Sequence, residues 1–137
     1  MTFVLDCSVT MAWVFPDESN TSTDALRASL IKDSAVVPVL WPIEVANVLL
    51  VATRRGRLSV EEWPGIRNAL NVLPIDIDLD SHDQVLERVM PIADQYELSV
   101  YDAMYLELAL RFGLPLATLD RRLNAAGKEA GLELLCS

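Results

Sequence analysis

Four acidic residues stand directly after, or near the start of, strongly apolar segments of this chain: Asp6, Glu44, Asp102 and Asp120. Two of them, Asp6 and Asp120, follow short apolar runs at residues 3–5 and 116–119. The other two fall in the first turn of segments with helical patterning. Carboxylate oxygens are the ligands that hard divalent cations such as Mg²⁺ and Mn²⁺ prefer. Such ions can activate water and neutralise charge in phosphodiester hydrolysis, so that chemistry suits this set of acids.

The helix expected around Glu44 is unusually apolar. Within residues 43–52 only Glu44 and Asn47 are polar, and their i, i+3 spacing places them on one face. A helix that is apolar nearly all round is predicted to be buried on most sides. Removing an unpaired carboxylate from water is costly, so a buried Glu44 needs a partner or a bound ion.

The elements that must position these acids alternate between strand and helix. Apolar or alternating runs predict strands, and helical periodicity with caps predicts helices. Strands are expected at residues 3–5, 35–40, 75–79, 115–119 and 132–135, and helices at residues 9–15, 23–31, 42–54, 81–96, 99–111 and 123–130, with one more after Ser59. This alternation predicts an α/β fold with a mostly parallel sheet covered by helices on both faces. Functional groups of such sheets lie beyond the strand C-termini, so the four acids map to one edge.

Three local features of these elements are also predicted. Ser22 or Thr23 is expected to cap the helix at residues 23–31. Pro91 is expected to kink or break the helix at residues 81–96. The strand at residues 75–79 alternates apolar residues with acids, which predicts one wet, acidic face.

The composition fits one globular domain spanning residues 1–137. The chain is 52% hydrophobic with a net charge of −9, which argues against a domain that coats nucleic acid by bulk electrostatics. A nucleic-acid enzyme whose acids hold metal ions stays compatible with this charge. Asp6 interrupts the apolar start, and no apolar run approaches the ~20 residues of a spanning helix, so neither export nor membrane insertion is expected. Two cysteines define no disulfide framework, and a cytoplasmic location is expected.

Each acid taken singly has a simpler explanation. Glu44 and Asp102, near helix N-termini, would interact favourably with the helix dipole, and any one acid could form half of a salt bridge. Few Lys or Arg residues stand beside the four acids in sequence. We therefore favour a shared cation over four separate roles.

The segments around the four acids resemble, in order, the PIN domain and, within it, the VapC-type toxins of bacterial toxin–antitoxin pairs. The resembling segments extend over nearly the whole chain: residues 4–9 with Trp13 and Pro16, residues 44–49 with 55–59, residues 98–103 with Tyr105, Leu106 and Ala109, and residues 117–120 with Leu123. Each segment alone is weakly specific, whereas the ordered set is strongly specific.

The resemblance implies a PIN-like three-layer α/β/α sandwich with about five short strands. It implies a divalent-metal-dependent endoribonuclease toxin that uses Mg²⁺ or Mn²⁺ to cleave structured RNA such as tRNA or rRNA. The implied site comprises an acidic quartet that is catalytic and metal-binding, with supporting hydroxyl and amide groups: Asp6, Glu44, Asp102, Asp120, Ser8, Thr118 and Asn47. Asp6, Asp102 and Asp120 are the expected ligands, and Glu44 is expected to bind a second ion or orient the attacking water.

Two positions depart from the family pattern. Cys7 replaces another small residue, and Ala12 stands where many relatives carry Lys just before the tryptophan. Neither touches the quartet, although Ala12 implies one fewer contact to substrate phosphate. The resemblance further implies a homodimer and a cognate VapB-like antitoxin that blocks the acidic groove.

Basic residues are few and fall in two groups. Arg54, Arg55 and Arg57 form the denser group, and Arg121 with Arg122 the other. At a helix C-terminus Arg54 and Arg55 would favour the dipole. Contact with RNA phosphates is an equally weighted interpretation of these arginines.

Two rival functions stay open at this point. One is an RNA-processing enzyme or a structure-specific DNA nuclease of the same fold, which is disfavoured because no arch or extra domain holds a DNA flap. The other is a non-catalytic or metal-dead binding module, which would require all four acids to be caps or salt-bridge partners.

Overall fold

The computed structural model describes residues 1–136, which contain a five-stranded sheet in the order β3-β2-β1-β4-β5. The strands are β1 (Thr2–Leu5), β2 (Ser34–Pro38), β3 (Ile75–Asp78), β4 (Leu116–Ala117) and β5 (Leu134–Leu135). Every neighbouring pair is parallel. The central strand β1 is buried on both sides, with Phe3, Val4 and Leu5 fully inaccessible, as expected where helices cover both faces.

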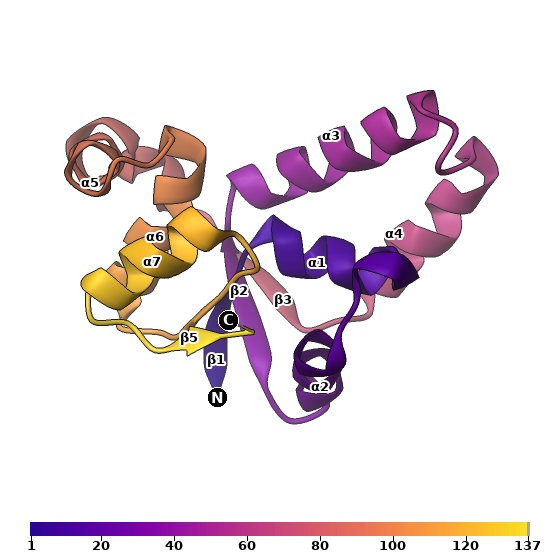
Figure 1. Cartoon of the computed structure of the whole chain (residues 1–137), viewed down its shortest axis with the longest axis horizontal. Coiled ribbons are helices and arrows are strands. Elements are labelled where there is room, and N and C mark those ends of the chain that lie inside the picture. The colour runs from indigo at the N-terminus through magenta and orange to yellow at the C-terminus, as the bar shows by residue number, and fades with distance from the viewer. Residues whose placement is uncertain (137) are drawn as a thin grey trace.

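Seven α-helices surround this sheet in the described part of the chain. They are α1 (Cys7–Val14), α2 (Thr21–Ser29), α3 (Leu40–Arg54), α4 (Trp63–Asn71), α5 (Met90–Tyr96), α6 (Val100–Phe112) and α7 (Arg121–Glu129). Figure 1 shows α5, α6 and α7 on one side of the sheet and α1 to α4 on the other. The predicted three-layer α/β/α architecture with a parallel sheet is therefore confirmed.

Helix α6 is the most deeply buried helix and carries much of the core. Its residues Tyr105, Leu106 and Leu108 are fully buried, and it packs on β1, β2 and β4. Ser99 caps its start by accepting a hydrogen bond from Asp102 N at 3.1 Å. Gly113 ends it in the left-handed conformation, φ 64°, where a residue without Cβ is favoured.

The cap of α2 differs from the prediction. Asn20, rather than Ser22 or Thr23, is the N-cap, and its side chain accepts from Thr23 N at 2.9 Å. The Thr23 hydroxyl in turn accepts from Asn20 N at 2.9 Å. Because this reciprocal pair satisfies two free amide groups, the helix starts earlier than its apolar pattern indicates.

The segment before α5 is broken, as Pro91 predicts. A 3₁₀ turn at Ser81–Gln84 and a π-helical turn at Val85–Val89 precede α5. Pro91 lies in the first turn of α5 and has no amide proton to donate to the preceding turn. The irregularity therefore lies upstream of the proline.

The prediction that the helix around Glu44 is buried on most sides is wrong. In α3 only Trp41, Val45 and Ala52 are buried, and Ile43 is 65% exposed. The reason is that α3 packs along one side against α1 and β2 and then turns back as α4. An open hollow of about 600 Å³ separates these two helices from β3, and we call it the α3–α4 hollow. Its apolar lining includes Trp41, Ala46, Leu49, Leu50, Trp63 and Leu70.

The predicted wet acidic face of β3 is also wrong at Asp78. Its side chain is only 8% exposed and pairs with Arg111 of α6 at 2.5 Å. Arg111 also pairs at 3.0 Å with Glu107, which is fully buried and receives a second arginine, Arg88. This network ties β3 to α6 and depends on three-dimensional placement rather than on strand alternation.

None of the helices in residues 1–136 is both long and apolar enough to span a bilayer.

Candidate active site

The C-terminal ends of β1 and β4 bring two site residues together. Val4 pairs with Leu116 and Leu5 with Ala117 in parallel register. The next residue on each strand is therefore a neighbour of the other across the sheet edge. There Asp6 N donates to Ala117 O at 3.0 Å.

Asp6 is held by two hydroxyl groups. Ser8 Oγ donates to its Oδ2 at 2.6 Å, and Thr118 Oγ1 donates to the same oxygen at 2.8 Å. These hydroxyls are fixed in turn, because Leu119 N donates to Ser8 and Asp120 N donates to Thr118. Ser8 and Thr118 therefore hold one oxygen of the Asp6 carboxylate, and Asp6 is only 5% exposed.

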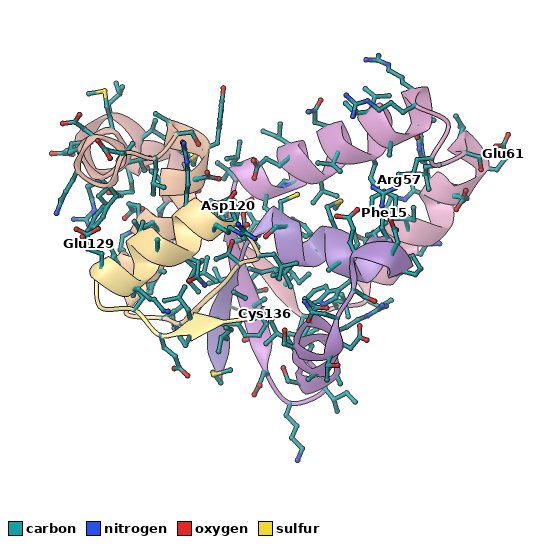
Figure 2. All side chains as sticks on the ribbon, in the orientation of Figure 1. Phe15, Arg57, Glu61, Asp120, Glu129 and Cys136 are labelled. Atoms are coloured by element: carbon teal, nitrogen blue, oxygen red, sulfur yellow. The ribbon has the colours of Figure 1, made fainter. Side chains whose placement is uncertain are left out.

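Asp120 reaches the same edge by a different route from the one predicted. β4 ends at Ala117, so Asp120 does not directly follow the strand but caps α7. Its Oδ1 accepts from Leu123 N at 2.9 Å, while its other oxygen has no hydrogen-bond partner among residues 1–136. Figure 2 places Asp120 at the start of α7, next to the start of α1.

Glu44 enters the site from α3. The helix begins at Leu40, so Glu44 lies in its second turn rather than in the predicted first turn. Its Oε1 accepts from the Tyr105 hydroxyl at 2.5 Å. Tyr105 belongs to α6 and is fully buried. No hydrogen bond to the other Glu44 oxygen is present in the described part of the chain.

Three of the four acids stand at helix N-termini. Asp6 and Asp120 are the N-caps of α1 and α7, and Asp102 is the third residue of α6. The positive ends of these helix dipoles therefore face the acids and favour their ionised forms.

Burial and mutual repulsion oppose that ionisation. Burial raises the pKa of Asp6, Glu44 and Asp102, and Asp102 reaches about 6. Neighbouring acids add to this effect: Asp120 raises the pKa of Asp6 and Asp102, and Asp6 raises that of Glu44. The hydrogen bonds to Asp6 and Glu44 offset part of the rise. The four carboxylates are therefore close enough for the negative charge of one to raise the pKa of another.

The donor set fits a hard divalent cation. Glu44 and Asp120 each use one oxygen for a protein hydrogen bond and leave the other without a partner among residues 1–136. Carboxylate oxygens of this kind suit Mg²⁺ or Mn²⁺. Within the same residues no three acidic, histidine or cysteine side chains form a closed metal-binding group. The acids share one edge of the sheet without forming a tight cage.

The remaining predicted site residues lie farther out. Asn47 is exposed on α3, one turn after Glu44, without a side-chain hydrogen bond in residues 1–136. Arg54 and Arg55 are exposed at the far end of α3, on the order of 15 Å along the helix from Glu44.

The other three arginines differ in what they contact. Arg121 and Arg122 are exposed in the first turn of α7, and Arg122 is near enough to lower the pKa of Asp102. Arg57 instead binds Asp17 at 2.9 Å and Glu18 at 2.7 Å.

Figure 2 shows Arg57 beside Phe15, over whose ring its guanidinium lies at 3.9 Å. Arg57 therefore ties the end of α3 to the chain after α1. This contact gives it a structural role that sequence spacing did not indicate.

The two departures from the family pattern are both buried. Cys7 is 7% exposed, and burial, with Glu44 and Asp6 nearby, raises the pKa of its thiol to about 12. It is therefore a neutral packing residue. Ala12 is 1% exposed and is therefore a buried packing residue of α1.

Sequence reasoning missed the contact between Tyr105 and Glu44. The only signal was the position of Tyr105 three residues after Asp102, which puts both side chains on one face of α6. That spacing indicates a shared face but does not identify the acceptor on a distant helix.

Comparisons with known proteins agree with this geometry. The family model described as the PIN domain matches residues 3–129. Ribonuclease VapC3 of Pyrobaculum aerophilum is 33% identical over 123 residues, covering 90% of this chain and 92% of that protein.

Solved structures show the same fold. PAE2754 from Pyrobaculum aerophilum has a TM-score of 0.69 at 24% identity, covering 98% of this chain and 92% of that one. VapBC2 from Rickettsia felis, bound to a promoter DNA fragment, has a TM-score of 0.63 at 12% identity, covering 98% and 97%. FitAcB from Neisseria gonorrhoeae has a TM-score of 0.60 at 17% identity, covering 98% and 96%.

Proposed function

The chain belongs to the PIN-domain family, within its VapC branch, and on that premise we propose that it is a divalent-metal-dependent endoribonuclease toxin acting in the cytoplasm. The observation that carries the proposal is that hydrogen bonds bring acids from separate parts of the chain together. Thr118 links Asp6 and Asp120. Glu44 is bonded to Tyr105, which lies one turn from Asp102 on α6.

The protein's own groups hold the reactants in place. Asp6 is locked by Ser8 and Thr118, so its carboxylate cannot rotate away from the site. Together with Asp102 and Asp120, and with Glu44 as a further ligand, it would hold Mg²⁺ or Mn²⁺. A cation bound there supplies water activation and neutralises charge on the leaving oxygen.

Glu44 is suited to orient the attacking water. Its Oε1 accepts from the Tyr105 hydroxyl, and its other oxygen has no hydrogen-bond partner among residues 1–136 and is available as an acceptor. Burial raises the pKa of Glu44, and a carboxylate with a raised pKa accepts a proton more readily near neutral pH. Asn47, one turn further along α3, would support the same end of the site.

Substrate phosphates would contact the exposed arginines nearest the acids. Arg121 and Arg122 adjoin Asp120 in sequence, and the positive charge of Arg122 lowers the pKa of Asp102. Arg54 and Arg55 would extend this contact for a long, structured RNA such as tRNA or rRNA. Arg57 contributes less, because Asp17 and Glu18 already bind its guanidinium.

The partner we propose is a VapB-like antitoxin, with the toxin itself a homodimer. Apolar side chains in the α3–α4 hollow are open to solvent over a volume of about 600 Å³. An open apolar surface of this kind is typical of a protein-binding site. An antitoxin seated there would lie within reach of Glu44 on the same helix.

The proposal is tested by mapping new 5′ ends in total RNA incubated with the purified protein. Cleavage at few sites is expected with Mg²⁺ or Mn²⁺ and none with chelator. The Asp6→Asn variant, which keeps an oxygen for Ser8 and Thr118, is the folded and inactive control. Cleavage that persists in chelator, or in Asp6→Asn, would overturn the proposal.

A further inference from the structure

Glu44 is held in the site by a single side-chain hydrogen bond among the described residues. Asp6 and Asp120 are joined by the hydroxyls of Ser8 and Thr118. Glu44 lies on α3, and in the described residues its side chain has one hydrogen bond, from the Tyr105 hydroxyl at 2.5 Å.

We propose that Tyr105 is a positioning residue that holds Glu44 by one oxygen and thereby presents the other to the metal and the attacking water. The proposal rests on the function proposed above. It adds a group that acts through Glu44 and touches neither metal nor RNA.

The hydroxyl of Tyr105 has Glu44 as its one hydrogen-bond partner among the described residues. The side chain is fully buried, and no other partner for the hydroxyl is present among residues 1–136. A buried hydroxyl left without a hydrogen-bond partner is costly, so the pair is expected to persist through thermal motion. A separation of 2.5 Å is typical of a hydroxyl bound to an ionised carboxylate.

The position of Tyr105 also relates two acids to each other. Asp102 and Tyr105 are one turn apart on α6, a helix buried in the core. The same rigid element therefore carries Asp102 and the group that holds Glu44. A shift of α3 relative to α6 would otherwise separate the two carboxylates.

Loss of a partner that orients a metal ligand typically weakens metal affinity or activity by about 10–100-fold. We expect Tyr105→Phe to weaken Mn²⁺ binding by roughly tenfold, measured by electron paramagnetic resonance without RNA. In the Glu44→Gln background the same substitution should change Mn²⁺ affinity by less than about twofold, because no carboxylate remains to be positioned.

Turnover is measured at saturating Mn²⁺ and RNA. Tyr105→Phe should lower kcat by about tenfold or more with little change in KM. Tyr96→Phe is the matched control, because Tyr96 packs at the edge of the core without a side-chain hydrogen bond in residues 1–136. It should alter neither Mn²⁺ affinity nor kcat.

A second pair of variants separates positioning from packing. Tyr105 replaced by p-aminophenylalanine keeps a donor at the same place, whereas p-methylphenylalanine fills the same space without one. The amine should restore Mn²⁺ affinity and turnover, and the methyl group should not. These replacements also serve if Tyr105→Phe fails to fold.

The outcomes distinguish this inference from the function on which it rests. Equal Mn²⁺ affinity and kcat in the wild type and Tyr105→Phe, or equal losses in the amine and methyl variants, would overturn the role of Tyr105 alone. A wild type that neither binds Mn²⁺ nor cleaves RNA would overturn the proposed function instead.

Discussion

Two regions on either side of α3 differ in nearly every physical respect. The acidic edge that holds Glu44 is polar, partly buried and cross-linked by short hydrogen bonds from Ser8, Thr118 and Tyr105. The α3–α4 hollow is apolar and open, and side-chain hydrogen bonds on its walls are few. One region has its groups fixed before any ligand arrives, and the other exposes surface that a partner would cover.

Under the proposed function, this difference would let α3 contribute to both catalysis and partner binding. Catalysis requires groups held in one geometry, because misplaced ligands lose affinity and rate. Docking of a protein requires removable apolar surface. Glu44 and Ala46 are two residues apart on α3 yet belong to the two regions, so substitutions at each should separate activity from partner binding.

The largest effect is expected at the acidic edge. Asp6→Asn should lower the RNA cleavage rate by at least about 1000-fold, since about 4 kcal/mol of transition-state stabilisation would be lost with the metal site. Partner binding should not change. Single-turnover cleavage of a mapped RNA substrate measures the rate, and circular dichroism verifies the fold. A residual rate within tenfold of wild type would remove Asp6 from the catalytic groups.

The corresponding test of the hollow is Ala46→Arg. Ala46 is exposed on the hollow's wall, so a large charged side chain there should fold but block an apolar partner. Affinity for the VapB-like antitoxin proposed above should fall about 100-fold or more, measured by calorimetry, with unchanged cleavage. Ala28→Arg on the exposed side of α2 is the control. Undiminished antitoxin binding by Ala46→Arg would show that the partner docks elsewhere.

A smaller effect is expected from the arginines. Replacing Arg121 and Arg122 by alanine should weaken RNA binding by about five- to tenfold at moderate salt, measured by fluorescence anisotropy in the Asp6→Asn background. Removing two phosphate contacts should reduce the log–log salt slope by about 1.4. Arg57→Ala should leave RNA affinity nearly unchanged, because its guanidinium is engaged by Asp17 and Glu18. The reverse order of effects would assign the RNA surface to the far end of α3.

The smallest effect is on stability. Asp102 has a folded-state pKa of about 6, raised from 3.8, so the folded protein binds more protons than the unfolded chain between these values. Its contribution to the free energy of unfolding therefore falls as pH rises through this window, and the loss is complete above about pH 6.

In metal-free protein, Asp102→Asn removes the loss of stability that comes from ionising the half-buried Asp102 carboxylate. At pH 7.5 its Tm should exceed that of wild type by about 3–5 °C, after allowance for solvent screening of a half-buried group. The difference should vanish below about pH 4 and reverse when Mg²⁺ is added. Differential scanning fluorimetry across pH tests this, and a Tm difference independent of pH would contradict it.

The fold and the acidic edge were largely predictable from sequence. Parallel strands end at one edge, so acids that follow strands must meet there, and Asp6 with Asp120 did so even though β4 is shorter than expected. Ser99 and Gly113 marked the ends of α6 correctly, because caps have local physical causes.

The exposure of α3, the pairing of Asp78 and the contact of Tyr105 depended on tertiary structure instead. An apolar helix can face a core or an open surface, and the sequence of α3 does not distinguish the two. Asp78 departs from strand alternation because Arg111 reaches it from α6. The Tyr105 contact joins residues 61 positions apart, and no local pattern specifies that pairing.

If the protein works as proposed, carboxylates distant in sequence share one cation. Crystals of the protein soaked in Mn²⁺, with anomalous diffraction data from wild type and Asp102→Asn, test it most directly. We expect a manganese peak bounded by Asp6, Asp102 and Asp120 in the wild type and its loss in the variant. A manganese peak away from these acids would contradict the shared site. So would the absence of a peak at the acids in a protein that cleaves RNA in solution.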